Sequence, residues 1–366
     1  MPTDTDARAL PQTATATADI ASTRILRLAL GTALALWFSQ AVGWSLSYVA
    51  PVFTLLLLAT PKPALPLKGG VAIVVLIMAA VYGGLLLLPM LTHQTVAGIL
   101  ILTLALFHTF YFTARSDNAA IGTLMIVGLT LTVTVGSVSV DAVLAVAKYV
   151  SIGALVGVLF VWIAHAIVPD PAVSGQAAPA PLPKPEKPSA ATARRSAMRS
   201  LAIVLPVAIV FLFSSDSASY LAVMIKVTSM TQQASSGKTR EAAVSLLLST
   251  LIGGLAALAG WMLIGIWPML TLYTLLIALA GLTMGRRIFA GDGMHGQAAT
   301  WSYAYLTMIV ILAPAVMDSL TGSSAGLAFF DRLLMFAGAT VYGVIAVYVF
   351  DAFWPSDERH DNAAHT

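Results

Sequence analysis

Long runs of apolar residues recur along the whole chain, separated by polar or Pro/Gly-containing breaks. A helix that crosses a bilayer needs about 20 mostly apolar residues. Twelve runs meet or approach this length. They predict transmembrane helices near residues 24–42, 46–61, 69–91, 95–113, 119–138, 142–168, 199–214, 218–232, 241–266, 268–286, 297–317 and 328–354. The second and eighth runs are the shortest.

The composition excludes a water-soluble fold. Of 366 residues, 58% are hydrophobic and 10% are charged, against roughly 25% charged residues in an ordinary soluble domain. The mean hydropathy is +0.89. We therefore expect an all-α integral membrane protein with about twelve transmembrane helices, embedded in a lipid bilayer. The chain has no cysteine, which excludes disulfides, thiolate metal sites and cysteine nucleophiles.

The net charge of +3 and the sequence pI of about 9.1 are compatible with a nucleic-acid partner or with a membrane. The positions of the charges favour the membrane, because cytoplasmic loops of membrane proteins are enriched in Lys and Arg. With the N-terminus inside, 16 of 19 basic residues fall in predicted cytoplasmic segments, and only Lys148, Lys226 and Arg332 do not. This predicts a multi-pass protein of the bacterial inner membrane with both termini cytoplasmic, and no nucleic-acid partner.

The pattern divides the chain into five regions. Residues 1–21 are rich in Thr and Ala and predict a disordered cytoplasmic N-terminus, and residues 22–169 form a first six-span unit. Residues 170–198 are rich in Pro and Ala and predict a cytoplasmic linker. A second six-span unit covers 199–355, and 356–366 form a cytoplasmic tail.

The two six-span units resemble each other. SYVAPVFTLLLLATPKPALPLKGG from Ser47 resembles SYLAVMIKVTSMTQQASSGKTRE from Ser219, and the closing helices from Ala147 and Asp331 also align. Because six is an even number, the two copies have the same orientation and are expected to be related by an axis along the membrane normal. Two parallel six-helix repeats are typical of transporters.

The Arg-initiated first helix, the SYVAPVFTLLLLATP segment, the duplicated unit and the final Gly-rich helix ending in Trp-Pro resemble the fusaric-acid-resistance and aromatic-acid-exporter permeases. The resemblance is to a compact bacterial branch and covers residues 22–355. It implies an inner-membrane permease that exports aromatic or other organic acids, with a periplasmic adaptor protein as a partner. Larger relatives carry a soluble domain where this chain has only its short linker.

Two glycine motifs resemble nucleotide-binding loops but lack the required context. Residues 291–296 have the G-x-G-x-x-G spacing without a preceding strand, and predict a flexible cytoplasmic loop. Residues 236–239 read SGKT, but Gln232 stands where a phosphate-binding loop needs Gly. The histidines show no metal-ligand spacing. We therefore expect no enzyme, no catalytic residue, no cofactor and no bound metal.

Two G-x-x-x-G motifs, Gly153/Gly157 and Gly281/Gly285, predict close approach of helices. Packing within one chain is the simpler interpretation, and a homo-oligomer is the alternative.

Lys226 is the most informative residue, because it stands inside the short apolar run 218–232. An ammonium at that depth costs roughly 2.5–3.5 kcal/mol on insertion scales, so it needs a cavity or a partner. We expect it to bind an anionic substrate together with Thr54, Thr228 and Ser229, where Pro51 and the hydroxyl residues interrupt the two short segments. A structural ion pair and snorkelling to the interface are the alternatives.

His165 and Asp351 each lie four residues before a proline that closes a six-span unit, at Pro169 and Pro355. Titratable groups at matching positions are candidates for proton coupling, with a merely hydrated position as the alternative. Together with the family resemblance, these features predict a proton-coupled secondary exporter of small organic anions, and the resemblance implies aromatic acids as the substrates. A passive organic-anion channel and a non-transporting membrane scaffold are the alternative functions.

Overall fold

The computed structural model describes residues 9–116, 119–135, 140–170, 188–214, 221–235, 239–291, 293–320 and 325–354. Within these residues the chain forms twelve α-helices and one pair of two-residue strands, β1 (Phe289–Ala290) and β2 (Gly293–Met294). The helices are α1 (Ala9–Val42), α2 (Val49–Leu58), α3 (Leu67–His93), α4 (Thr95–Arg115), α5 (Ala119–Val135), α6 (Val140–Ile167), α7 (Ala190–Leu212), α8 (Leu221–Ser235), α9 (Thr239–Ile266), α10 (Leu270–Ile288), α11 (Ala298–Leu320) and α12 (Ala325–Phe353).

The helical membrane class expected from the sequence is confirmed. In the described part of the chain, eight helices are long and apolar enough to cross a membrane, namely α3, α4, α6, α7, α9, α11, α12 and the Asp19–Val42 part of α1. Helices α2 and α8 are apolar but shorter. With 10 and 15 residues, they measure about 15 and 22 Å at 1.5 Å per residue, less than the roughly 30 Å of a hydrocarbon core.

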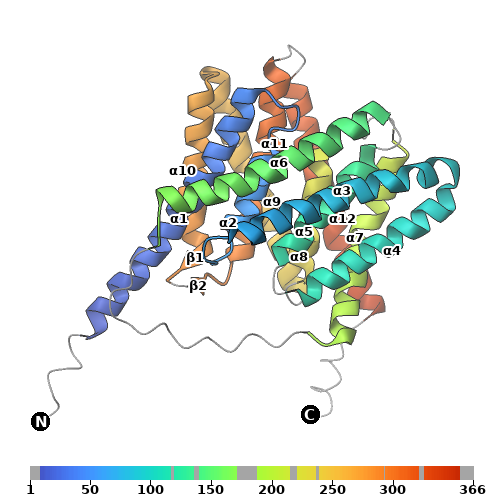
Figure 1. Cartoon of the computed structure of the whole chain (residues 1–366), viewed down its shortest axis with the longest axis horizontal. Coiled ribbons are helices and arrows are strands. Elements are labelled where there is room, and N and C mark those ends of the chain that lie inside the picture. Colours follow the sequence, from blue (N-terminus) through green and yellow to red (C-terminus); the bar gives the residue numbers. More distant parts are fainter. Residues whose placement is uncertain are drawn as a thin grey trace, which may run out of the picture.

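Two predicted boundaries were wrong. Helix α1 begins at Ala9, inside the region expected to be disordered, and it projects beyond the bundle in Figure 1. Helix α7 begins at Ala190, inside the predicted linker, where the Ser189 side chain accepts a hydrogen bond from the Thr192 backbone. At the start of α7 the stretch rich in Ala and Arg has a high helix propensity although it is not apolar, whereas the Thr-rich start of α1 has no such explanation. Residues 1–8, most of the linker (171–187) and the tail from 355 lie outside the described residues.

The two short helices are continuous, contrary to the interruptions expected in them. Pro51 lies in the first turn of α2, where its missing N–H is not needed by the helix. In α8, Thr228 donates to the Met224 carbonyl, and Thr231 donates to the Thr228 carbonyl. Hydroxyls that bond back to their own helix are compatible with an unbroken helix in an apolar surrounding.

The α10–α11 connection is a short antiparallel hairpin, whereas the sequence predicted a flexible loop. Phe289 pairs with Met294 and Ala290 with Gly293, and Gly291 supplies the positive φ of 60° that the turn requires. Asp292 lies outside the described residues. The hairpin lies between α10 and α11, and each of its strands has only two residues, whereas a dinucleotide-binding motif follows a full strand of a βαβ unit.

The helices pack in the same pattern in both halves of the chain. Helices α1–α2, α2–α6 and α3–α5 are in contact in the first half, and α7–α8, α8–α12 and α9–α11 are in contact in the second. Across the halves, α1 packs on α10 and α7 on α4, while α2 packs on α11 and α8 on α5. In Figure 1, the first turns of α1 and α7 and the last turns of α10 and α12 lie at the lower end of the molecule.

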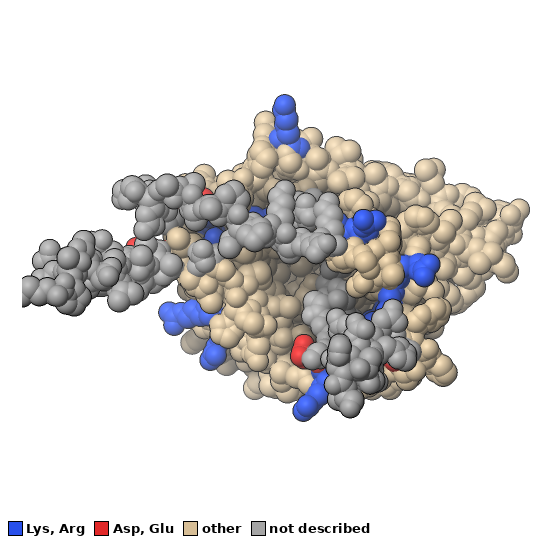
Figure 2. Space-filling model, turned by 90° about the horizontal axis from the view of Figure 1, so that it is seen from below, with Lys and Arg blue, Asp and Glu red and all other residues tan. Residues whose placement is uncertain are grey.

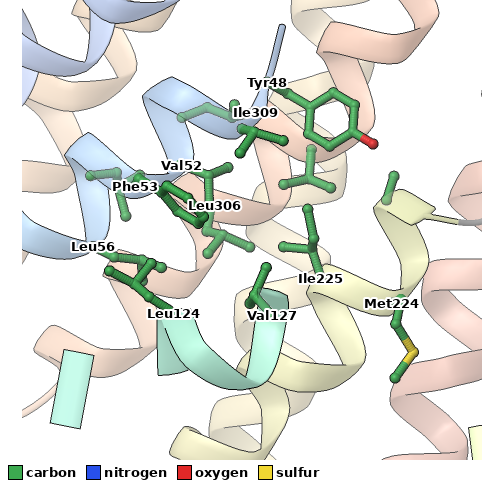
Figure 3. Packing of buried hydrophobic residues seen from close by; sticks show 14 of the residues in the cluster. Tyr48, Val52, Phe53, Leu56, Leu124, Val127, Met224, Ile225, Leu306 and Ile309 are labelled. Atoms are coloured by element: carbon green, nitrogen blue, oxygen red, sulfur yellow. The ribbon is translucent and has the colours of Figure 1, made fainter. Parts of the chain in front are cut away.

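The centre of the molecule is built by one short and one longer helix from each half. Figure 3 shows Val52 and Phe53 of α2, Val127 of α5, Ile225 of α8 and Leu306 of α11 packed together. All five side chains are at most 1% exposed. The two short helices are therefore enclosed by protein rather than by lipid, which allows polar groups within them.

Both G-x-x-x-G motifs pack helices within the chain, as the simpler interpretation predicted. Gly153 and Gly157 of α6 face α2, where a Cβ on Gly157 would come within 2.8 Å of the Phe53 Cβ. Gly281 and Gly285 of α10 face α1.

Basic side chains gather at the lower end of the molecule. Figure 2 shows Lys and Arg distributed around this face. The exposed or half-buried basic residues near this end are Arg24, Lys62, Lys68, Arg115, Arg194, Arg195, Arg240, Arg286 and Arg287. The positive-inside tendency predicts that this end faces the cytoplasm.

We expect cysteine labelling to place this basic end inside the cell. Single cysteines at Ala64 and Gly296, which are exposed near the basic end, are expected to resist a membrane-impermeant thiol reagent in intact cells. Cysteines at Ser45 and Gln94, which are exposed in the α1–α2 and α3–α4 connections, are expected to react. The cysteine-free chain is the built-in control, and labelling at Ala64 but not at Gln94 would reverse the topology.

Candidate functional site

The candidate site surrounds Lys226, whose side chain is fully buried in α8. Its ammonium donates to Thr307 Oγ1 of α11 at 2.9 Å and to Ser249 Oγ of α9 at 3.4 Å. All three residues are 0% exposed. Lys226 therefore does not snorkel to the surface, and its charge lies at the junction of three helices of the second half.

Helices α9 and α11 approach each other closely beside this ammonium. A Cβ on Gly253 would lie 2.4 Å from the Ala304 carbonyl oxygen and 2.6 Å from the Thr307 Cβ. A glycine in α9 thus allows the α11 backbone to come near enough for Thr307 to reach Lys226. The close contact leaves the ammonium enclosed.

Two further pairs of hydroxyl groups involve the helices that carry Lys226 and Ser249. Thr228 Oγ1 of α8 lies 3.4 Å from Thr130 Oγ1 of α5, which is a contact between the two halves of the chain. Thr250 of α9 and Thr340 of α12 share a hydrogen bond of 2.8 Å. These four hydroxyl side chains are at most 8% exposed.

No carboxylate balances the Lys226 charge within the described residues, where the ion pairs involve only Arg27, Arg195 and Arg199 as cations. The contacts of Lys226 are with hydroxyls, which solvate an ammonium but do not neutralise it. A buried ammonium without a counter-ion is costly. The arrangement suits an anion that arrives with its own negative charge.

The other predicted substrate-binding residues occupy different places. Ser229 donates to the Lys226 backbone carbonyl at 2.7 Å and so supports the helix. Thr54 donates to the carbonyls of Ala50 and Gly157, which places it in the α2–α6 contact. Of the predicted set, Thr228 is the one whose hydroxyl links the two halves, and no described contact joins Thr54 to Lys226.

His165 and Asp351 lie at the ends of α6 and α12, at the basic face. His165 is half-buried, and its Nδ1 is 2.9 Å from the Val161 carbonyl oxygen of its own helix. Asp351 has a side chain that is only 9% exposed. Their roles in proton coupling stay a prediction.

Asp351 is held by two arginines of α7. Arg195 and Arg199 each donate to one of its carboxylate oxygens at 2.6 Å, and Thr239 of α9 donates to it as well. Arg195 also donates to the Trp354 carbonyl at 2.8 Å. This network, which we call the second-half clamp, ties the start of α7 to the end of α12.

A similar first-half clamp ties α1 to the end of α6. Arg27 donates from Nε to the Val168 carbonyl at 2.6 Å and from Nη1 to Asp170 at 2.7 Å. In each clamp an arginine of the first helix satisfies a carbonyl just before the proline that follows the sixth helix. The arginine is Arg27 in the first half and Arg195 in the second, and the matching prolines Pro169 and Pro355 were the available signal.

Ser249 and Thr307, the two partners of the ammonium, were missed by sequence reasoning. Each is one of several hydroxyl residues in a long apolar helix, and nothing in its spacing indicates which helix it faces. Only the packing of α9 against α11 brings them together. Within the described residues, no group of His, Asp or Glu side chains could hold a metal ion.

Comparison with known proteins gives one match. Residues 24–164 match the model of a family described as a protein of unknown function (DUF2955). The matched stretch runs from the first turns of the apolar part of α1 to near the end of α6. No curated protein matches the chain, and no solved structure matches it.

Proposed function

We propose that this protein is a secondary exporter that moves small organic anions, aromatic acids in particular, out of the cell across the inner membrane. The observation that carries the proposal is Lys226, a fully buried ammonium that contacts hydroxyls and has no carboxylate partner among the described residues. Such a group inside a membrane protein is expected to serve a substrate pathway. The carboxylate of the substrate supplies the missing negative charge.

We further propose that the chain is built from two parallel six-helix repeats. The recurrence of the same helix contacts in both halves supports this, as do the two arginine clamps. The family match that spans 24–164 also falls within the first proposed repeat. Transporters built from repeats place substrate sites where the repeats meet, and α8 packs on α5 of the other half.

The enclosed Lys226 requires a second conformation for transport. Its 0% exposure means that an acid cannot reach it while α8, α9 and α11 are packed as described. Alternating access to a fixed central site is the mechanism of such transporters. A permanently open channel would need a continuous path from the surface to the Lys226 ammonium.

The function is tested by flux in proteoliposomes that contain the purified full-length chain. With an imposed pH gradient, we expect accumulation of a radiolabelled aromatic acid against its own gradient, and little net accumulation without the pH gradient. Empty liposomes and liposomes with a neutral analogue of the acid are the controls. Downhill flux that ignores the pH gradient would indicate the channel, and flux equal to that of empty liposomes would indicate the scaffold.

A further inference from the structure

A basic pocket opens at the lower end of the first half, where α1, the α2–α3 connection and α6 meet. Its lining includes the three cations Arg24, Arg27 and Lys62, with His165 beside them. The rest of its wall is mostly apolar and includes Leu57, Leu58, Leu65, Ile73 and Val161. We call it the first-half pocket.

Arg27, which lines this pocket, carries an unsatisfied donor. Its side chain is only 4% exposed, and while Nε and Nη1 bond to the end of α6, its Nη2 is buried without a hydrogen-bond partner. A buried guanidinium N–H that lacks an acceptor costs free energy. An anion in the pocket would provide that acceptor.

The second half has a carboxylate at a position where the first half has a histidine. Asp351 stands four residues before Pro355, and its carboxylate joins Arg195 and Arg199. The matching position before Pro169 is His165, which contributes no negative charge. Asp170 bonds to Arg27 but is 61% exposed and reaches only Nη1. Among the described residues that line the first-half pocket, the clamp arginine Arg27 is present, but there is no buried carboxylate.

We propose that the first-half pocket binds the phosphate of an anionic phospholipid, which takes the place that the Asp351 carboxylate takes in the second half. A phosphodiester accepts hydrogen bonds from an arginine fork and from several cations at once. Basic pockets between transmembrane helices on the cytoplasmic side are suited to such headgroups. The inference does not depend on the proposed transport function.

The surroundings of the pocket favour a lipid over free phosphate. Leu67 and Val71 at the start of α3 are 69% and 51% exposed, and Ile167 at the end of α6 is 54% exposed. These apolar surfaces lie on two of the elements that form the pocket, at the same ends. Acyl chains can lie on them while the headgroup contacts the cations, whereas inorganic phosphate would gain nothing from the apolar wall.

The test uses the full-length protein, stripped of lipid in an uncharged detergent and titrated with dioctanoyl phosphatidylglycerol, phosphatidylcholine of the same chain length, or sodium phosphate. The unfolding temperature reports binding. We expect phosphatidylglycerol alone to raise it, with an apparent affinity that Lys62→Gln weakens about tenfold or more, since charge-assisted hydrogen bonds are lost. Arg286→Gln, which removes an exposed charge at the same end, is expected to leave the affinity unchanged.

His165→Asp gives the sharpest result, because it supplies the carboxylate present in the second half. Without lipid this variant is expected to unfold at a higher temperature than the parent protein, and phosphatidylglycerol is expected to have no further effect. Equal stabilisation of His165→Asp and the parent by phosphatidylglycerol would overturn the proposal. Equal effects of phosphatidylcholine would also overturn it, and equal effects of sodium phosphate would overturn the assignment to a lipid.

Discussion

Replacing Lys226 by Gln is expected to reduce export of aromatic acids by at least about 30-fold, since removing one partner of a buried charged pair commonly costs 2–5 kcal/mol. Glutamine retains much of the side-chain length and can still bond to Thr307 and Ser249, which contact the ammonium in the parent protein. Folding is expected to be preserved, because no carboxylate within the described residues depends on this charge.

Three measurements separate substrate binding from a structural role of Lys226. Export in proteoliposomes gives the activity, membrane abundance gives the folding, and Lys226→Arg tests whether charge alone suffices. We expect partial activity from the arginine variant because its wide, planar head fits a site shaped for an ammonium poorly. Lys148→Gln is the matched control, since Lys148 is an exposed lysine on α6. Normal abundance with undiminished export in Lys226→Gln would eliminate the binding role.

Replacing Asp351 by Asn is expected to destabilise the protein by about 3–5 kcal/mol, the usual effect of removing one partner from a buried ion pair. Arg199 has a side chain that is 5% exposed and would keep its charge without the carboxylate. Arg195, which is 27% exposed, would lose less stabilisation because water can solvate its charge. A clear fall of the unfolding temperature in detergent, together with reduced abundance, is the expected measurement.

Asp170→Asn is the matched control for this experiment, because Asp170 pairs with the clamp arginine of the first half at 2.7 Å but is 61% exposed. Arg27 is 4% exposed and would lose a charged partner, but the exposed Asp170 leaves this pair open to water, so this variant should lose less stability than Asp351→Asn. The two variants also distinguish a clamp from a proton relay. If Asp351→Asn is as stable as Asp170→Asn and transport loses its dependence on the pH gradient, Asp351 carries protons instead.

The positions of the helices were predictable, because lipid demands long apolar runs wherever a helix meets it. The starts of α1 and α7 were not, since Ala9 and Ala190 begin polar stretches that the apolar pattern leaves out, and helix propensity accounts only for the start of α7. The continuity of α8 was missed for a related reason. Its threonines look like breaks in hydropathy, yet their hydroxyls bond back to the helix.

Of the residues that form the candidate site, only the charged residue Lys226 could be predicted from the sequence. Lys226 stood out because a lysine in an apolar run is expensive, and the structure places it in full burial. Its neighbours Thr307 and Ser249 come from helices distant in sequence, so their contact depends on the packing around Gly253. For the arginine clamps, the matching positions before Pro169 and Pro355 could be recognised in the sequence, but the hydrogen bonds at these positions could not.

The two clamps restrict where the helices can move apart at the basic end of the molecule. Arg27 ties α1 to the end of α6, and Arg195 and Arg199 tie α7 to the end of α12. In each half, the first helix is therefore bonded to the end of the sixth helix at the basic end of the molecule. An opening at this end would then have to form along the contact between the two halves, where α5 meets α8 and α2 meets α11.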